Sequence, residues 1–298
     1  MKTEKNILIA FLLNLCFSIF EIVGGLFTNS IAIVSDAVHD FGDSISIGVS
    51  YLLEKKSKKK PDNKYTYGYT RYSVLGAIIT NTILILGSIL VIYNAITRII
   101  NPEEINHNGM IIFAIIGTIV NIIAAYVTKE GDSLNQKAVN LHMLEDVLGW
   151  LVVLVGAIII KLTNITIIDP ILSIIVALYI LINATKSFKK VFNLFLEKTP
   201  EDIEIEELKH HILEIKGVLD IHHIHIWSID GYSNYATMHV VTDTKKIEEL
   251  KHSIKEELSE HGISHTTIEI EDKDSQCNEK ECSIKENHNH HGHHHHHH

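Results

Sequence analysis

The sequence predicts an α-helical membrane protein with six transmembrane helices, followed by a small α+β domain of element order αββαβ. Two observations predict this division: residues 1–200 contain long apolar runs, whereas residues 201–286 are polar and hold 21 acidic residues against 9 basic ones. A chain of 298 residues is long enough for one or two domains. We expect a membrane domain at 1–190, a linker at 191–200, the α+β domain at 201–272 and a flexible tail at 273–298.

Six segments hold the roughly 20 apolar residues that cross a bilayer core. They are residues 7–27, 31–53, 73–97, 110–128, 139–161 and 166–186. Very short links join the first two segments and the last two, so each of these pairs is expected to form an antiparallel hairpin. A large soluble helical core is the alternative, and the distribution of lysines argues against it.

Basic residues mark one side of the predicted membrane domain. The link between the second and third segments carries seven: Lys55, Lys56, Lys58, Lys59, Lys60, Lys64 and Arg71. Lysines also flank the N-terminus, the link between segments four and five, and the end of segment six. By the positive-inside rule both termini, and with them the α+β domain, are expected in the cytoplasm.

No cleavage site follows the first apolar run, so we expect it to be retained as a helix.

Composition also excludes some classes of protein. An acidic C-terminal domain argues against nucleic-acid binding, which needs a basic face, and it is compatible with attracting cations. Three cysteines form no disulfide framework. Cys277 and Cys282, spaced C-x₄-C, are a weaker zinc motif than C-x₂-C. The terminal histidines resemble an expression tag, so residues 288–298 are excluded from the functional interpretation.

Ionisable residues inside two predicted membrane segments form a repeated pattern. His39-x-x-x-Asp43 lies in the second segment and His142-x-x-x-Asp146 in the fifth. A spacing of i, i+4 puts both members of a pair on one helix face. Burying such groups costs a few kcal/mol each, so they are functional by default. Two facing pairs would offer a cage of two imidazoles and two carboxylates.

This cage predicts a metal site. Nitrogen and oxygen ligands on rigid helices suit tetrahedral Zn²⁺, with Cd²⁺ and Co²⁺ as competitors. Metal and protons compete for imidazole, so such a site could exchange Zn²⁺ for H⁺. A structural His–Asp hydrogen bond is the alternative, and the repetition disfavours it. Four further acidic residues are expected to line the cavity or support the ligands: Glu21, Asp36, Asp40 and Glu145.

Several stretches resemble the cation diffusion facilitator family. "GGLFTNSIAIVSDAVHDFGDS" is similar to its first hairpin, "LHMLEDVLGW" to its fifth helix, and "IHHIHIWSI" to its cytoplasmic domain. The paired H-x-x-x-D motifs resemble its zinc-transporting, cobalt–zinc–cadmium resistance-like branch. The resemblance implies a homodimer, in a bacterial plasma membrane, that exports divalent metal in exchange for protons. It places the transport site at His39, Asp43, His142 and Asp146.

The family often has a second metal site in the loop between helices two and three. That loop reads "KKSKKKPDNKYTYGYTRYS" here, without a histidine. Asp62 alone is a poor ligand set, so we expect this site to be absent or weak. The lysines are better explained as an anchor at the anionic lipid of the membrane face.

The α+β domain resembles a ferredoxin-like, metallochaperone-type fold with a regulatory and dimerising role. It holds nine histidines, against three in residues 1–200. By resemblance, His222, His239 and Glu271 would bind regulatory Zn²⁺ and bridge two subunits; ordinary surface histidines are the alternative. Strand alternation places His223 and His225 on one face with Ile221 and Trp227, and His222 on the other.

The sequence therefore predicts a proton-coupled antiporter that exports Zn²⁺, with Cd²⁺ or Co²⁺ as further substrates, by alternating access. A metal-gated divalent cation channel is the alternative. A membrane metalloenzyme is disfavoured, because zinc catalysis needs an open coordination position and four protein ligands would close this site. We expect no enzymatic activity.

Overall fold

The computed structural model describes residues 2–28, 31–101, 107–130, 133–163, 167–274 and 277, without the side chains of some helical residues, among them 31–39 and 107–110. The chain forms two compact units. The helical unit comprises Met1–Lys198 and Ile229–Tyr232, and the α/β unit comprises Thr199–Ser228 and Ser233–His298.

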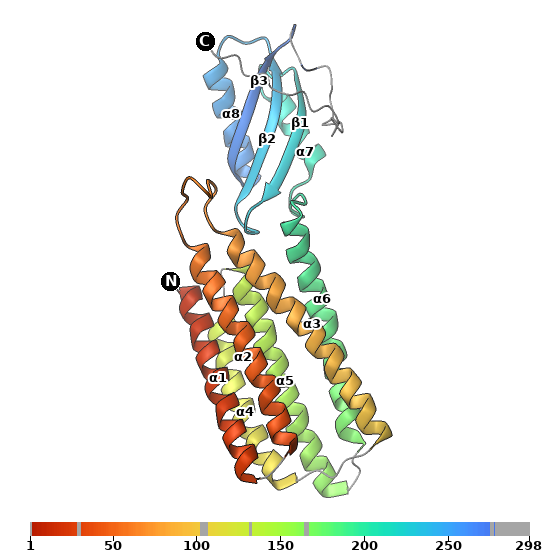
Figure 1. Cartoon of the computed structure of the whole chain (residues 1–298). Coiled ribbons are helices and arrows are strands. Elements are labelled where there is room, and N and C mark those ends of the chain that lie inside the picture. The colour runs from red at the N-terminus through yellow and green to blue at the C-terminus, as the bar shows by residue number, and fades with distance from the viewer. Residues whose placement is uncertain are drawn as a thin grey trace, which may run out of the picture. The chain divides into compact units, whose positions relative to one another are not determined.

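Six long helices form the helical unit (Figure 1). They are α1 (Lys2–Thr28), α2 (Ile31–Ser57), α3 (Arg71–Ile100), α4 (His107–Thr128), α5 (Leu134–Thr163) and α6 (Ile168–Phe195). Each overlaps one predicted segment, and α6 runs on into the predicted linker. Within the described residues, four stretches are long and apolar enough to cross a membrane: Thr3–Gly24, Arg71–Ile100, Ile111–Thr128 and Leu134–Gly156.

The helical unit places apolar side chains outside and polar ones inside. Leu86 and Tyr126 are 62% and 77% exposed, whereas Asn81, Ser88 and Asn121 are fully buried. α1 packs against α2 and α4, α3 against α2 and α6, and α5 against α3, α4 and α6. An apolar outer surface suits lipid, and small or polar residues between helices suit close packing in a membrane.

The α/β unit has the predicted order of elements. It comprises α7 (Ile205–Glu214), β1 (Asp220–Ser228), β2 (Asn234–Thr242), α8 (Ile247–Glu260) and β3 (Ile263–Asp272). The sheet has the order β1-β2-β3, with β1 antiparallel and β3 parallel to β2. Gly262, at φ +75°, lies two residues after the last residue of α8 and lets the chain turn into β3.

One face of this sheet packs against α7 and α8. Alternate residues of β2 are buried there, including Met238 and Val240. They meet Leu250, Ile254 and Leu258, which share one face of α8 because they are spaced by four residues. Burying each side chain of this size stabilises the folded state by roughly 1.5–3 kcal/mol relative to leaving it exposed to water. The opposite face of the sheet is left for polar side chains.

The predicted alternation of β1 is wrong, because the strand contains a bulge. The pairing of β1 with β2 shifts register between His222 and His225, and His223 has φ +49°. Ile221 and Ile226 consequently both lie in the core, although an odd number of positions separates them. His222 and His223 thus have neighbouring rings, with centroids 5.2 Å apart, instead of lying on opposite faces.

Candidate metal sites

α2 and α5 bring three of the four predicted transport-site residues together. Ligand atoms of Asp43, His142 and Asp146 all lie within 4.8 Å of one another. His142 and Asp146 share one face of α5 through their i, i+4 spacing. The fourth residue, His39, lies in α2 one turn before Asp43, and its side chain lies outside the described residues.

His142 occupies the middle of this acidic group. Its Nε2 lies 3.7 Å from Asp43 Oδ2 and 4.0 Å from Asp146 Oδ2. The side chain is 4% exposed, and neither ring nitrogen makes a hydrogen bond to another described residue. A buried polar group without such a partner is costly. Ligands of tetrahedral Zn²⁺ are separated by about 3.3 Å, so a divalent cation here would need only a small inward movement of the side chains.

A third carboxyl group, that of Glu145, lies beside the other nitrogen of the same imidazole. Glu145 Oε2 lies 3.9 Å from His142 Nδ1, and Ser88 of α3 donates a hydrogen bond of 3.3 Å to Glu145 Oε1. This geometry gives Glu145 the supporting position that the sequence indicates. Glu21 is fully buried in α1, and Asn14 donates to the backbone carbonyl of Asp40 at 3.4 Å. The side chain of Asp36 lies outside the described residues.

Two turns towards the C-terminus of α2 and two turns towards the N-terminus of α5, a buried polar network joins these helices to α3. Ser50 donates to Asn135 Oδ1 at 2.8 Å and lies 2.6 Å from the Thr80 hydroxyl. Glu54, only 3% exposed, accepts hydrogen bonds from Ser73 and Ser133. Its neighbours satisfy this carboxylate, which makes it a structural rather than a ligand group.

In the loop between α2 and α3, Asp62 organises its own neighbours. It accepts hydrogen bonds from the Tyr69 hydroxyl at 2.7 Å, the Lys59 ammonium at 3.1 Å, and the amides of Lys64 and Tyr65 at 2.9 and 3.0 Å. The Tyr69 hydrogen bond, followed by that of the Tyr65 amide, holds the pKa of this carboxyl well below its usual range. The carboxylate oxygens are therefore engaged by protein donors.

The α/β unit brings His222, His239 and Glu271 together. His239 faces His222 across the β1–β2 ladder. Glu271 Oε2 lies 3.3 Å from His222 Nε2, and Glu271 Oε1 lies 2.6 Å from His239 Nδ1. Burial raises the pKa of Glu271, but hydrogen bonds from the Cys277 amide and His239, with the charges of the histidines, leave it below its usual value. This is a ligand group of two imidazoles and a carboxylate.

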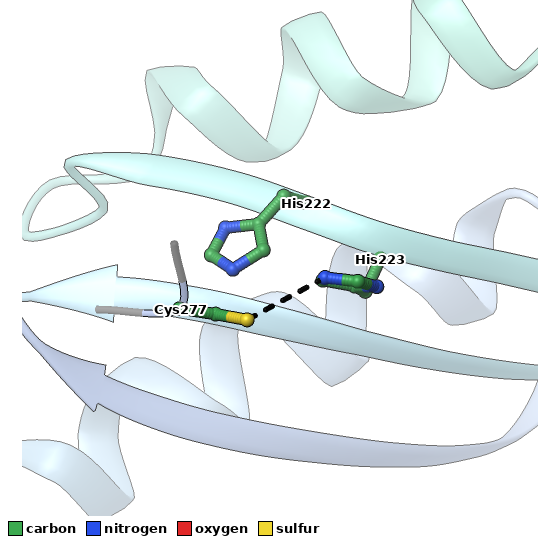
Figure 2. A group of neighbouring side chains, drawn as sticks. All are labelled: His222, His223 and Cys277. Atoms are coloured by element: carbon green, nitrogen blue, oxygen red, sulfur yellow. Dashed lines mark hydrogen bonds between the residues drawn. The ribbon is translucent and has the colours of Figure 1, made fainter. Parts of the chain in front are cut away.

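Two further groups were not predicted as sites from the sequence. Cys277 Sγ lies 3.8 Å from His223 Nε2, near His222 (Figure 2). His211 and His261 meet where α7 and α8 pack, with Glu257 beside them: His211 Nδ1 lies 3.1 Å from His261 Nε2 and 3.2 Å from Glu257 Oε1. The signals in the sequence were the enrichment in histidine and, for Cys277, the weak C-x₄-C motif. His265 lies beside Tyr235, outside these groups.

Comparison with known proteins assigns both units. Residues 7–196 match the cation efflux transmembrane domain, and residues 200–273 match the cytoplasmic domain of cation efflux proteins. The chain belongs to the cation efflux family. This confirms the resemblance to the cation diffusion facilitators and the predicted fold class of a helical membrane domain followed by a small α/β domain. A member of this family is an integral membrane transporter of metal cations and not an enzyme.

Curated relatives cover nearly the whole chain. The cadmium, cobalt and zinc/H⁺-K⁺ antiporter of Bacillus subtilis is 35% identical over 90% of this chain and 89% of its own length. The zinc transporter ZitB of Yersinia pseudotuberculosis is 34% identical over 96% and 92%. The metal cation efflux protein CzcD of Cupriavidus metallidurans is 33% identical over 90% and 86%. These names support the zinc, cobalt and cadmium branch of the family.

Proposed function

We propose that this protein exports Zn²⁺, with Cd²⁺ or Co²⁺ as further substrates, from the cytoplasm in exchange for protons. The observation that carries the proposal is the buried His142, which lies between the carboxylates of Asp43 and Asp146 without a hydrogen bond to another described residue. His39, one turn before Asp43, would complete a tetrahedral His₂Asp₂ site. Mixed nitrogen and oxygen ligands favour Zn²⁺ over Mg²⁺ or Ca²⁺.

Proton coupling follows from the ligands. Metal binds neutral imidazole and ionised carboxylate, so an arriving ion displaces the protons that these groups otherwise hold. If the site opens to one side at a time, Zn²⁺ leaves as protons enter. Alternating access then links the two fluxes without a separate proton channel.

The assembly we propose is a homodimer in the bacterial plasma membrane, with both termini in the cytoplasm. The basic residues of the α2–α3 loop support this orientation. In the α/β unit, Zn²⁺ bound by His222, His239 and Glu271 would act as a regulatory ligand and bridge the two subunits. Metal-dependent cross-linking of the dimer, lost in His239→Ala, would test this second site.

Purified protein in sealed lipid vesicles tests transport. An imposed proton gradient should drive Zn²⁺ uphill, with a matching proton flux of opposite direction. His142→Ala and Asp43→Ala should reduce this exchange to the background of empty vesicles while eluting like the wild type in gel filtration. The matched controls His210→Ala and Asp62→Ala, which change the same residue types elsewhere, should transport normally.

Two results would overturn the proposal. Normal Zn²⁺/H⁺ exchange by His142→Ala or Asp43→Ala would rule out the proposed transport site. Zn²⁺ flux that runs only down its own concentration gradient would favour the metal-gated channel. Because the Bacillus relative is named for both H⁺ and K⁺, a parallel series with a K⁺ gradient identifies the coupling ion.

A further inference from the structure

The chain beyond β3 returns to the sheet at Cys277. The amide of Cys277 donates a hydrogen bond of 2.9 Å to Glu271 Oε2. This contact holds the thiol next to β1, where Sγ lies 3.8 Å from His223 Nε2 (Figure 2). Cys277 is half-buried, so the thiol is sheltered but reachable by a small ion.

The bulge in β1 aims His223 at this thiol. Neighbouring residues of a regular strand point to opposite faces, but the irregularity between His222 and His225 puts the rings of His222 and His223 side by side. His223 adopts φ +49°, a left-handed conformation that costs a non-glycine residue roughly 1–2 kcal/mol. Backbone strain of this kind gathers at functional sites.

His222 supplies a second, independent observation. Its side chain is 4% exposed, and neither ring nitrogen makes a hydrogen bond to another described residue. The nearest carboxylate oxygen, Glu271 Oε2, lies 3.3 Å from Nε2. One ligand atom from each of His222, His223 and Cys277 lies within 4.8 Å of the other two. On tetrahedral Zn²⁺, nitrogen and sulfur ligands are separated by about 3.5 Å, close to the distance between His223 and Cys277.

We infer that His222, His223 and Cys277 form a thiolate-containing binding site for a soft divalent cation, Zn²⁺ or Cd²⁺. The thiolate distinguishes this site from the nitrogen and oxygen sites described above, because sulfur ligands select softer metals. The bound ion would fix the segment after β3 against β1. The site shares His222 with the proposed regulatory group but does not depend on transport through the helical unit.

Cadmium titration of the whole protein tests this inference. The metal-free chain, shortened to end at residue 287 to remove the terminal histidines, is titrated in detergent while thiolate-to-Cd²⁺ charge-transfer absorption is recorded. We expect a band whose intensity at saturation corresponds to one Cd²⁺–thiolate bond per chain and which is absent from Cys277→Ser. His223→Ala should weaken Cd²⁺ binding at least about tenfold, since loss of even a supporting group costs 10–100-fold.

Four control variants separate this site from its neighbours. Cys16→Ser and Cys282→Ser should keep the band, as should His239→Ala and Asp43→Ala, which remove the regulatory and transport groups. A wild-type protein without the band, a band that survives in Cys277→Ser, or its loss in Cys282→Ser would each overturn the inference. The titration measures metal binding at Cys277, whereas the vesicle experiments measure transport through the helical unit. A negative result in one experiment therefore does not contradict the proposal tested by the other.

Discussion

His142 of α5 and Asp43 of α2 face each other across 3.7 Å, and both side chains are almost fully buried. This distance is too long for a hydrogen bond. The two helices therefore meet at polar groups that do not satisfy each other directly. Such an arrangement is costly in a membrane unless a cation or protons occupy the space between the groups, which makes the surroundings of His142 the first place to test.

Glu145 is expected to tune the affinity of this site without being a ligand. Glu145→Gln replaces the carboxyl group 3.9 Å from His142 Nδ1 with an amide of similar size but keeps an acceptor for Ser88. Supporting groups of this kind change metal affinity by about 10–100-fold. Isothermal titration with Zn²⁺ should show weakening of that order, and vesicle transport should persist at high Zn²⁺. Complete loss of transport at saturating Zn²⁺ would instead make Glu145 a ligand.

Glu54 is expected to stabilise the helical unit. Glu54→Ala leaves the hydroxyls of Ser73 and Ser133, now 2.8 and 3.1 Å from its carboxylate, without this acceptor. An orphaned buried polar group costs about 1–3 kcal/mol. Thermal unfolding in detergent should therefore show a clearly lowered midpoint.

The matched control for Glu54 is another glutamate in an ion pair at the surface. Glu197 lies 2.8 Å from Arg71, but the two side chains are 60% and 41% exposed. Exposed pairs contribute about 0–1 kcal/mol, so Glu197→Ala should leave the midpoint nearly unchanged. Equal effects of the two substitutions would contradict the structural role of the buried network.

Gly117 of α4 is expected to tolerate no side chain. A Cβ there would lie 2.7 Å from the Trp150 ring and 2.8 Å from the Phe17 ring. Overpacking of this kind costs typically 1–3 kcal/mol. Gly149 of α5 has nothing within 4 Å of an added Cβ, so Gly149→Ala should be neutral or slightly stabilising. Thermal unfolding of the two variants checks this expectation. If Gly117→Ala and Gly149→Ala lower the midpoint by the same amount, the helix packing described here is contradicted.

The loop around Asp62 is expected to resist acid. Its pKa is lowered by the hydrogen bond from the Tyr69 hydroxyl and then by that from the Tyr65 amide. The contribution of a carboxylate with a lowered pKa is fully present above its unfolded value of about 3.9 and is lost only as the pH falls through the lowered value. Hydrogen exchange of residues 58–70, corrected for intrinsic rates, should stay constant from neutral pH down to about 4.

Asp62→Asn supplies the comparison for this loop. The amide cannot accept from all four donors, so exchange should be faster at every pH above the native pKa. The wild-type and variant rates should converge only in stronger acid. Wild-type exchange that becomes faster already between pH 7 and 5 would contradict the lowered pKa of Asp62, because a carboxylate with a lowered pKa keeps its hydrogen bonds throughout this range.

The helical part of the site could be predicted from the sequence because its rules are local. The i, i+4 spacing of His142 and Asp146 fixes their shared face through the period of the helix. Repetition of the motif in α2 indicated that Asp43 would face them, and the structure brings it there. The support of Glu145 by Ser88 could not be predicted, because it depends on how α3 packs against α5.

The α/β unit shows where such local rules fail. A period of two predicts the faces of β1 only while the ladder keeps its register, and the sequence does not reveal the bulge at His223. The position of Cys277 depends on its contact with Glu271, and the meeting of His211 with His261 depends on the packing of α7 and α8. These contacts join segments that no sequence spacing relates.

Replacing His223 with glycine separates metal binding from stability. Glycine adopts φ +49° without the steric cost that histidine pays. Without metal, His223→Gly should therefore unfold at the same or a higher temperature than the wild type, yet bind Cd²⁺ at least about tenfold more weakly. His225 provides the control, because it is exposed in the same strand and does not have a positive φ. His225→Gly should lower the free energy of unfolding by about 0.5–1 kcal/mol and should keep Cd²⁺ binding. If His223→Gly is destabilised as much as His225→Gly, the bulge is not strained, and strain at His223 gives no support to a metal site there.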